Sequence, residues 1–175
     1  HLVGGDIHYD CLGNNNYRVT VNVYRDCFST GPNVADFDDP AFIAIYEGSS
    51  LYSVENIFLD GRTNIPPVIN NPCLQTPPNV CVEEGTYSFN IQLPSSATGY
   101  KLVYQRCCRN QTIINLSQPQ NQGATFSVDI PSSNLASCNN SPRFNDFPPI
   151  AICANEPLVF DHSANDPDGD NIIYQ

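Results

Sequence analysis

The sequence contains no tryptophan, no methionine and a single lysine, Lys101, among its 175 residues. Its 7 basic side chains are outnumbered by 18 acidic ones, so the formal net charge is −11. A surface that binds nucleic acid needs clustered Lys and Arg to neutralise the phosphate backbone. The composition therefore argues against nucleic acid as a partner.

The sequence also lacks a run of about 18 apolar residues, the length that a membrane-spanning helix requires. We therefore expect no membrane span. Nor is a signal peptide visible, and we expect a leader to have been removed before His1. Hydrophobic residues make up 41% of the chain and charged residues 14%, a balance typical of a folded protein.

Long helices are not expected, because 15 prolines are spread along the chain. Short stretches with alternating apolar and polar residues instead predict β-strands, since successive side chains of a strand point to opposite faces. The predicted strands are residues 3–9, 17–24, 42–47, part of 51–59, 86–93, 99–105, 111–116 and 124–130. The turn-forming stretch LGNNN, residues 12–16, predicts a hairpin between the first two strands, with Cys11 opposite Tyr17.

Strands at this spacing predict an all-β fold, an Ig-like antiparallel β-sandwich, over residues 1–130. Alternation weakens after Pro131. Residues 131–175 are therefore interpreted as a linker followed by a docked or partial Ig-like or cadherin-like β segment, in which 157–175 read as strand, loop and strand. Two strands cannot form an independent domain.

The eight cysteines form no CxxC pair of the kind found in structural zinc sites. Disulfides are the better interpretation, and they imply an oxidising compartment, so that the protein is secreted, periplasmic or on a cell surface. Cys11 and Cys27 lie too far apart in the predicted hairpin to pair with each other. If Cys107 and Cys108 lie on a strand, they face opposite sides and address different partners. The proposed pairing joins these two positions to the hairpin cysteines, with local bridges Cys73–Cys81 and Cys138–Cys153. The alternative is a reactive vicinal pair, either a redox switch or a soft-metal site, activated by Arg106 and Arg109.

The stretch ANDPDGDNIIY places three carboxylates at alternate positions around Pro167 and Gly169. A hard cation with oxygen ligands would relieve their repulsion, and calcium is the natural candidate. The EF-hand spacing is not met, and a solvated turn explains the same residue types. The predicted ligands are Asp166, Asp168 and Asp170, with Asp161 as a further candidate.

A second acidic stretch, ADFDDP at residues 35–40, is interpreted as a loop, with metal binding as the alternative. The three histidines, His1, His8 and His162, match no catalytic or metal motif. Converging carboxylates for glycoside hydrolysis cannot be identified from sequence. We therefore do not expect an enzyme.

Three stretches together resemble a known family: HLVGGDIHYDCLGNNNYRVTVNVYRDC, YQRCCRN and FDHSANDPDGDNIIY. Their order and content are similar to the N-terminal region of large surface proteins of gliding bacteria, the gliding-motility-associated proteins exported by the type IX secretion route. The resemblance covers nearly the whole chain. It implies PKD-like or cadherin-like repeats further along the full-length proteins, and it implies calcium at Asp166, Asp168 and Asp170.

These features together predict an extracellular structural or adhesive module of a bacterial cell-surface protein, one that assembles with copies of itself or with other surface modules, including into a filament. The alternative is a carbohydrate-binding module that recognises surface glycans through exposed aromatic rings. The burial of its nine tyrosines and nine phenylalanines would distinguish the two.

Overall fold

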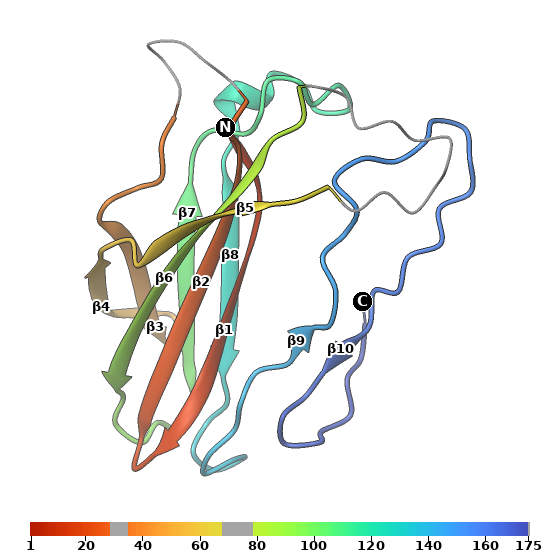
Figure 1. The fold of residues 1–175 in the computed structure, drawn as a ribbon. Helices are drawn as coiled ribbons and strands as arrows, with labels where there is room; N and C mark the ends of the chain where they lie inside the picture. Colours follow the sequence, from red (N-terminus) through yellow and green to blue (C-terminus); the bar gives the residue numbers. More distant parts are fainter. Residues whose placement is uncertain (29–34, 68–78, 175) are drawn as a thin grey trace.

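The computed structural model describes residues 1–28, 35–67 and 79–174. Eight strands form two four-stranded antiparallel sheets, which pack face to face (Figure 1). The first sheet has the order β1-β2-β6-β5 and the second the order β4-β3-β7-β8. The strands are β1 (Leu2–Gly13), β2 (Asn16–Asp26), β3 (Ala41–Glu47), β4 (Ser50–Ile57), β5 (Gly61–Ile65), β6 (Val82–Gln92), β7 (Tyr100–Arg106) and β8 (Ala124–Ile130).

Read in chain order, this arrangement is that of an immunoglobulin sandwich. An Ig domain places its strands A, B, E and D in one sheet and C, F and G in the other, with an extra strand beside C in some variants. The first, second, sixth and fifth strands here occupy the A, B, E and D positions, and β4 is the extra strand beside β3. The predicted Ig-like sandwich is confirmed.

The core lies between the sheets and follows the alternation seen in the sequence. On β2, Val19, Val21 and Val23 are fully buried. They face apolar residues from the opposite sheet, because every second side chain of each strand points inward. The buried core also includes Tyr9, Tyr87, Ile43, Ile45, Leu102 and Tyr104.

The first hairpin has the predicted register, since Cys11 pairs with Tyr17. Gly13, Asn14 and Asn15 have φ angles of +84°, +52° and +59°. Gly and Asn tolerate this left-handed backbone better than other residues do, so LGNNN can close the turn.

Within the sandwich, one predicted strand is not formed and one strand was missed. Residues 111–116 form turns and bends, followed by a short 3-10 helix at Pro119–Asn121. Their apolar residues are not packed in the core, since Ile114 is completely exposed. Conversely, Gly61–Ile65 forms β5, which the sequence pattern missed because four of its five residues are exposed and show no alternation.

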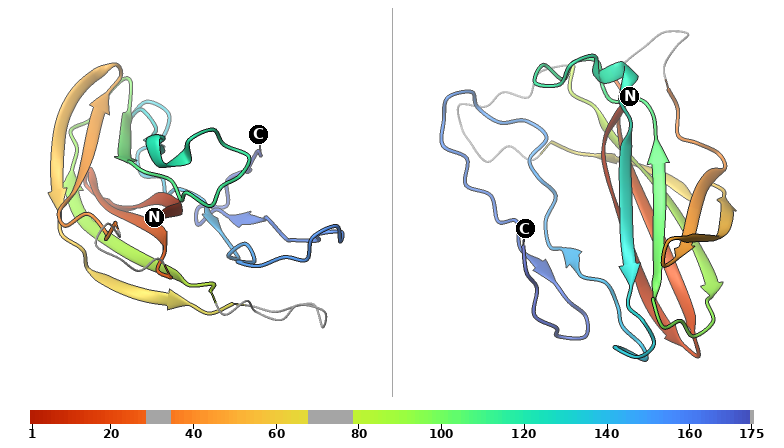
Figure 2. Two further views of the ribbon diagram at one scale, coloured as in Figure 1. Left: turned by 90° about the horizontal axis from the view of Figure 1, so that it is seen from above. Right: turned by 180° about the vertical axis from the view of Figure 1, so that it is seen from behind.

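The segment after β8 runs beside the sandwich, along the outer edge of β1 (Figure 2). Its regular structure consists of β9 (Arg143–Phe144) and β10 (Ala164–Asn165), which pair with each other. The strands expected within residues 157–160 and 171–174 are not formed. No helix in the described part of the chain has the length and apolar character needed to cross a membrane.

Candidate functional site

The C-terminal segment is fastened to β1, an edge strand of the first sheet. Tyr9 donates its backbone N–H to Ser141 Oγ at 2.8 Å, and the Ser141 N–H donates to the Tyr9 carbonyl at 3.0 Å. The Cys11 N–H donates to Asn140 Oδ1 at 2.8 Å, and Cys11 forms a disulfide with Cys138. Together these bonds cover a stretch of sheet edge that would otherwise be unpaired.

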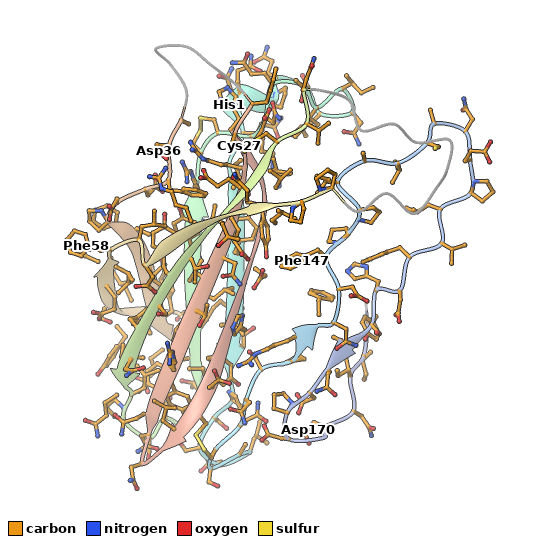
Figure 3. All side chains as sticks on the ribbon, in the orientation of Figure 1. His1, Cys27, Asp36, Phe58, Phe147 and Asp170 are labelled. Carbon is orange, nitrogen blue, oxygen red and sulfur yellow. A yellow bond between two sulfur atoms is a disulfide. The ribbon has the colours of Figure 1, made fainter. Side chains whose placement is uncertain are left out.

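The predicted calcium loop lies next to this attachment. The carboxylates of Asp166, Asp168 and Asp170 each offer an oxygen within 4.8 Å of the others, the one such group of three within the described residues. Figure 3 places Asp170 near the hairpin end of the sandwich, far from Asp36 at the opposite end. The sequence prediction thus identified three carboxylates that the fold brings together.

The loop is shaped by its own backbone and held by Asn140. Asp166 Oδ1 accepts hydrogen bonds from the Asp168 N–H at 2.8 Å and the Asp170 N–H at 3.3 Å. Asp168 accepts the Asn140 N–H and side-chain amide at 2.6 Å and 2.8 Å. Ionised carboxylates can accept further bonds, so these oxygens still suit a hard cation. Asp161 is not part of the group, and its Oδ1 accepts the Ser163 N–H at 2.9 Å.

The predicted disulfide pairing is wrong, although six of the seven cysteines in the described residues are bonded. The bridges are Cys11–Cys138, Cys27–Cys81 and Cys107–Cys108. Cys81 therefore does not pair with Cys73, which lies outside the described residues. Cys138 does not pair with Cys153, which is free.

The error at the vicinal pair has a structural reason. Strand β7 ends at Arg106, so the alternation that would aim Cys107 and Cys108 at opposite faces does not extend to them. Their peptide bond is cis and their Cα atoms lie 3.1 Å apart. The segment instead joins the first strand: the Leu2 N–H donates to the Cys108 carbonyl, and the Asn110 N–H donates to the Leu2 carbonyl.

The second acidic stretch connects the two sheets. We call its residues 36–38 the Phe37 plug. The Phe37 ring is buried under two guanidinium groups, those of Arg25 at 4.9 Å and Arg62 at 5.3 Å from its centroid. The Phe37 ring packs directly against Gly85 of β6, where an added Cβ would lie 2.7 Å from the ring. Only glycine leaves room for the ring.

The carboxylates of the Phe37 plug, those of Asp36 and Asp38, accept hydrogen bonds from other residues of the chain. Burial opposes ionisation of Asp36, yet the hydrogen bond from Arg62, the Phe37 N–H and the charge of Arg25 together hold its pKa below the ordinary value. Asp38 Oδ2 accepts the Tyr104 hydroxyl at 2.7 Å, and the Asp38 carbonyl accepts the Tyr87 hydroxyl at 2.7 Å.

Arg106, at the end of β7, also contacts the Phe37 plug. It is 7% exposed, and its guanidinium donates to the Asp36 carbonyl. It also lies 3.8 Å from the Asp38 carboxylate. Residues 35–40 form no helix or strand, so the interpretation of ADFDDP as a loop is confirmed.

A further polar cluster, which the sequence analysis missed, lies on the outer face of the first sheet around Asp6. The Asp6 carboxylate accepts the Tyr24 hydroxyl at 2.8 Å and the Asn22 amide at 3.1 Å, and His8 Nδ1 lies 3.3 Å away. Burial, followed by the negative charge of Asp6, raises the pKa of Tyr24. The hairpin register, which sets Asp6 directly opposite Asn22, is the signal that could have revealed it.

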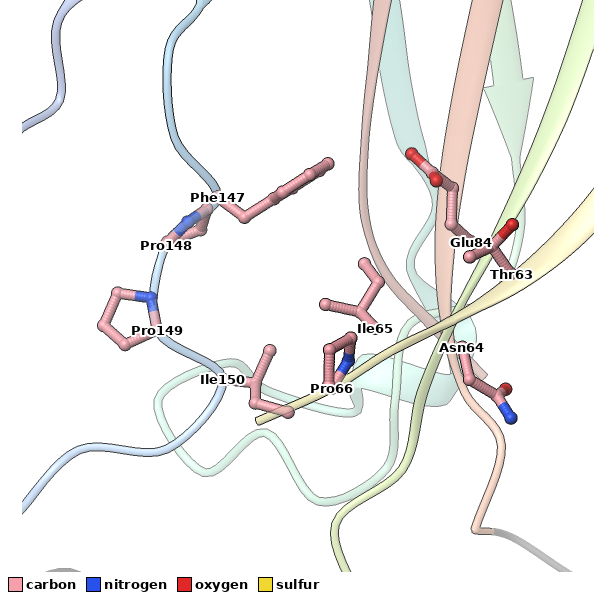
Figure 4. A pocket seen from close by; sticks show the side chains of 9 residues that line it. All are labelled: Thr63, Asn64, Ile65, Pro66, Glu84, Phe147, Pro148, Pro149 and Ile150. Atoms are coloured by element: carbon pink, nitrogen blue, oxygen red, sulfur yellow. The ribbon is translucent and has the colours of Figure 1, made fainter. Parts of the chain in front are cut away.

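A cavity of about 250 Å³ separates the C-terminal segment from the end of β5 (Figure 4). Ile150 of the C-terminal segment points toward Pro66, and Phe147 points across the cavity toward the sandwich, where its ring packs edge-on against Tyr24 with centroids 5.7 Å apart. The lining is mainly apolar, with the carboxylate of Glu84 at one side. None of the residues predicted as a site lines it. Its chemistry suits an apolar group better than a sugar, which needs several converging hydrogen-bond partners.

Comparison with models of protein families, with curated proteins and with solved structures finds no match to this chain.

Proposed function

We propose that this chain is an extracellular structural module of a bacterial surface protein, serving surface assembly or adhesion. The observation that carries the proposal is the Cys11–Cys138 bridge, which joins the sandwich covalently to the segment that follows it. Stable disulfides form in oxidising compartments, outside the reducing cytosol. A folded block whose two ends are tied together suits a load-bearing building unit.

The resemblance to gliding-motility-associated proteins supports this function through the positions of its three stretches. The first stretch forms the β1-β2 hairpin, and the second, ending in Asn110, hydrogen-bonds to Leu2 at the start of that hairpin. The third contains Asp168, which binds Asn140 beside the Cys11–Cys138 bridge. The segments that carry the resemblance thus make hydrogen bonds that hold the module together.

Calcium at Asp166, Asp168 and Asp170 is part of the proposal. Three carboxylates within reach of one ion provide the hard oxygen ligands that calcium takes. Because Asp168 also binds Asn140, an ion at this loop would be tied to the edge of β1.

The proposed location and role can be tested on the producing cells. Intact cells would be treated with a membrane-impermeant biotin reagent, with a cytosolic protein as the control for leakage. We expect this protein to be labelled and the cytosolic protein not. Beads coated with the oxidised chain should also bind cell or glass surfaces more than beads coated with the reduced chain. Absence of surface labelling would contradict the proposal.

The carbohydrate-binding alternative depends on exposed aromatic rings, and the burial of the tyrosines weighs against it. Tyr9, Tyr17, Tyr87, Tyr100 and Tyr104 all point into the core. Of the seven exposed rings among the described residues, Phe42, Tyr52 and Phe58 lie in or just after β3 and β4, and the others, Phe28, Phe144, Phe147 and Tyr174, lie elsewhere. Binding of the chain to a glycan array, lost on Phe42→Ala, would favour the alternative.

A further inference from the structure

The edges of the two sheets are treated differently by the rest of the chain. Strand β1 is covered by the C-terminal segment at Tyr9 and Cys11, and by the segment after β7 at Leu2. Strand β4 is the outer strand of the second sheet, on the side away from the C-terminal segment (Figures 1 and 2). Within the described ranges, the structure shows no hydrogen bond from another segment to the outer edge of β4.

Strand β4 has one feature that can hinder pairing with another strand, a register shift at Tyr52 between the pairs Ile45–Ser53 and Tyr46–Leu51, but it lacks several others. Edge strands are commonly protected by Lys, by Pro or by a very short length. Over its eight residues, β4 has no proline and no basic residue. Its one charged side chain, Glu55, accepts the Ser53 hydroxyl at 2.9 Å.

The surface next to this edge is apolar. Leu51, Val54 and Phe42 are between 47% and 59% exposed. The register places Ala44 opposite Val54 and Tyr46 opposite Leu51, so these side chains share the outer face of the sheet. Phe58, just beyond the strand, is 69% exposed. The patch is continuous with the unpaired backbone of β4.

The charge of this face identifies the partner. The molecule carries a net charge of −11, so two copies repel each other over most of their surfaces. The outward positions of β3, β4, β7 and β8 carry one lysine and one aspartate, which lie opposite each other and form an ion pair, Lys101–Asp129, at 2.8 Å. A face with no net charge gives no preference to a charged partner. Two acidic copies can approach each other there with less electrostatic repulsion than over the rest of their surfaces.

We propose that β4 pairs antiparallel with β4 of a second copy of this chain, about a two-fold axis near Val54. The backbone edge binds the partner strand by sheet extension, and the two apolar patches become continuous across the joint. With the axis at Val54, Ser53 lies opposite Glu55 of the other copy and Tyr52 lies opposite Asn56. No like charges face each other in this register.

This inference rests on the proposed function, for which it names one partner and one contact. Sedimentation equilibrium of the full chain is the direct test, at about 1 μM to about 1 mM, the range over which weak self-association becomes measurable. We expect the mass to rise from 19.3 kDa toward twice that value. Val54→Lys should weaken the association by at least about tenfold, because two new ammonium groups meet at the axis.

The matched control is Ile114→Lys, which adds the same charge at a fully exposed position away from β4. It should associate like the unaltered chain. Hydrogen exchange supplies a second measurement: amides of β4 should gain protection as the concentration rises, whereas those of β5 and β8, which are also edge strands, should not. A constant mass of 19.3 kDa, equal association of the two variants, or no protection in β4 would overturn the proposal. Surface labelling of cells would be unaffected by that result, so the two proposals fail separately.

Discussion

At the scale of single residues, the Phe37 plug depends on a missing side chain. Gly85 has ordinary backbone geometry, so its need for glycine comes from the Phe37 ring rather than from its own φ angle. The neighbouring strand offers a comparison, because an added Cβ at Gly61 of β5 meets nothing within 4 Å.

Gly85→Ala should therefore destabilise the protein and Gly61→Ala should not. Forcing one extra carbon against a packed ring costs about 1–3 kcal/mol. Urea denaturation of both variants measures the difference in the free energy of unfolding. Equal stability of the two would show that the Phe37 ring moves aside at no cost.

The buried tyrosines give the protein a dependence on alkaline pH. Burial raises the pKa of Tyr87 from 10.0 to about 12. The neutral hydroxyl is thus favoured in the folded state, and its contribution to stability is complete below pH 10 and is lost as the pH rises toward 12. The shift corresponds to about 2–3 kcal/mol.

We expect the free energy of unfolding to fall between about pH 10 and pH 12, as folded-state tyrosines resist ionisation. Urea denaturation at a series of pH values, followed by fluorescence, measures this slope. Tyr87→Phe should have a shallower slope than the unaltered chain. A slope unchanged by Tyr87→Phe would contradict the assignment.

At the scale of elements, the loop of residues 166–170 is connected to the sandwich through one side chain. Asn140 accepts the Cys11 N–H and donates to the Asp168 carboxylate, so it bridges β1 and the acidic loop. This bridge could not be predicted from sequence, because its partners lie 28 and 129 positions away.

Calcium binding should depend on the three clustered carboxylates and not on Asp161. Asp170→Asn removes a ligand charge and should weaken calcium affinity by about tenfold or more, whereas Asp161→Asn should leave it unchanged. Isothermal titration with calcium measures both. If the titration detected no binding of calcium to the unaltered chain, the proposed calcium site would be wrong.

Most strands could be predicted because their alternation matches burial: Val19, Val21 and Val23 are buried as the pattern requires. The missed strand β5 lies at an edge, where both faces are open and alternation carries no signal. The 111–116 prediction failed because apolar composition alone does not specify burial, as exposed Ile114 shows. The clustering of Asp166, Asp168 and Asp170 could be predicted because these residues are close in sequence. The Asp6 cluster could be predicted only from the register of the hairpin, which places Asp6 opposite Asn22.

At the scale of the whole molecule, the two long-range bridges are the features that sequence could least provide. Cysteine pairing depends on which segments lie side by side, and the docking of residues 138–143 on β1 was not visible as a pattern. The bridges span 127 and 54 positions. Chain-entropy estimates give them about 5 and 4 kcal/mol, comparable with the roughly 5–15 kcal/mol that stabilises a domain.

Reduction should therefore lower the melting temperature strongly or unfold the chain. Calorimetry with and without reductant measures this effect, and non-reducing peptide mapping should find Cys11 linked to Cys138 and Cys27 linked to Cys81. Replacing both members of one bridge by serine separates their contributions. A melting temperature indifferent to reductant would contradict the importance of the bridges.

The bridge between Cys11 and Cys138 also decides how the module responds to tension. A force applied to the chain on either side of these residues reaches the sulfur–sulfur bond, so the chain between them, which contains β2 to β8, cannot be pulled out into an extended form. Only the flanking residues can lengthen. Stretched from its ends, such a unit would behave as an inextensible link, giving way first where the C-terminal segment peels from β1.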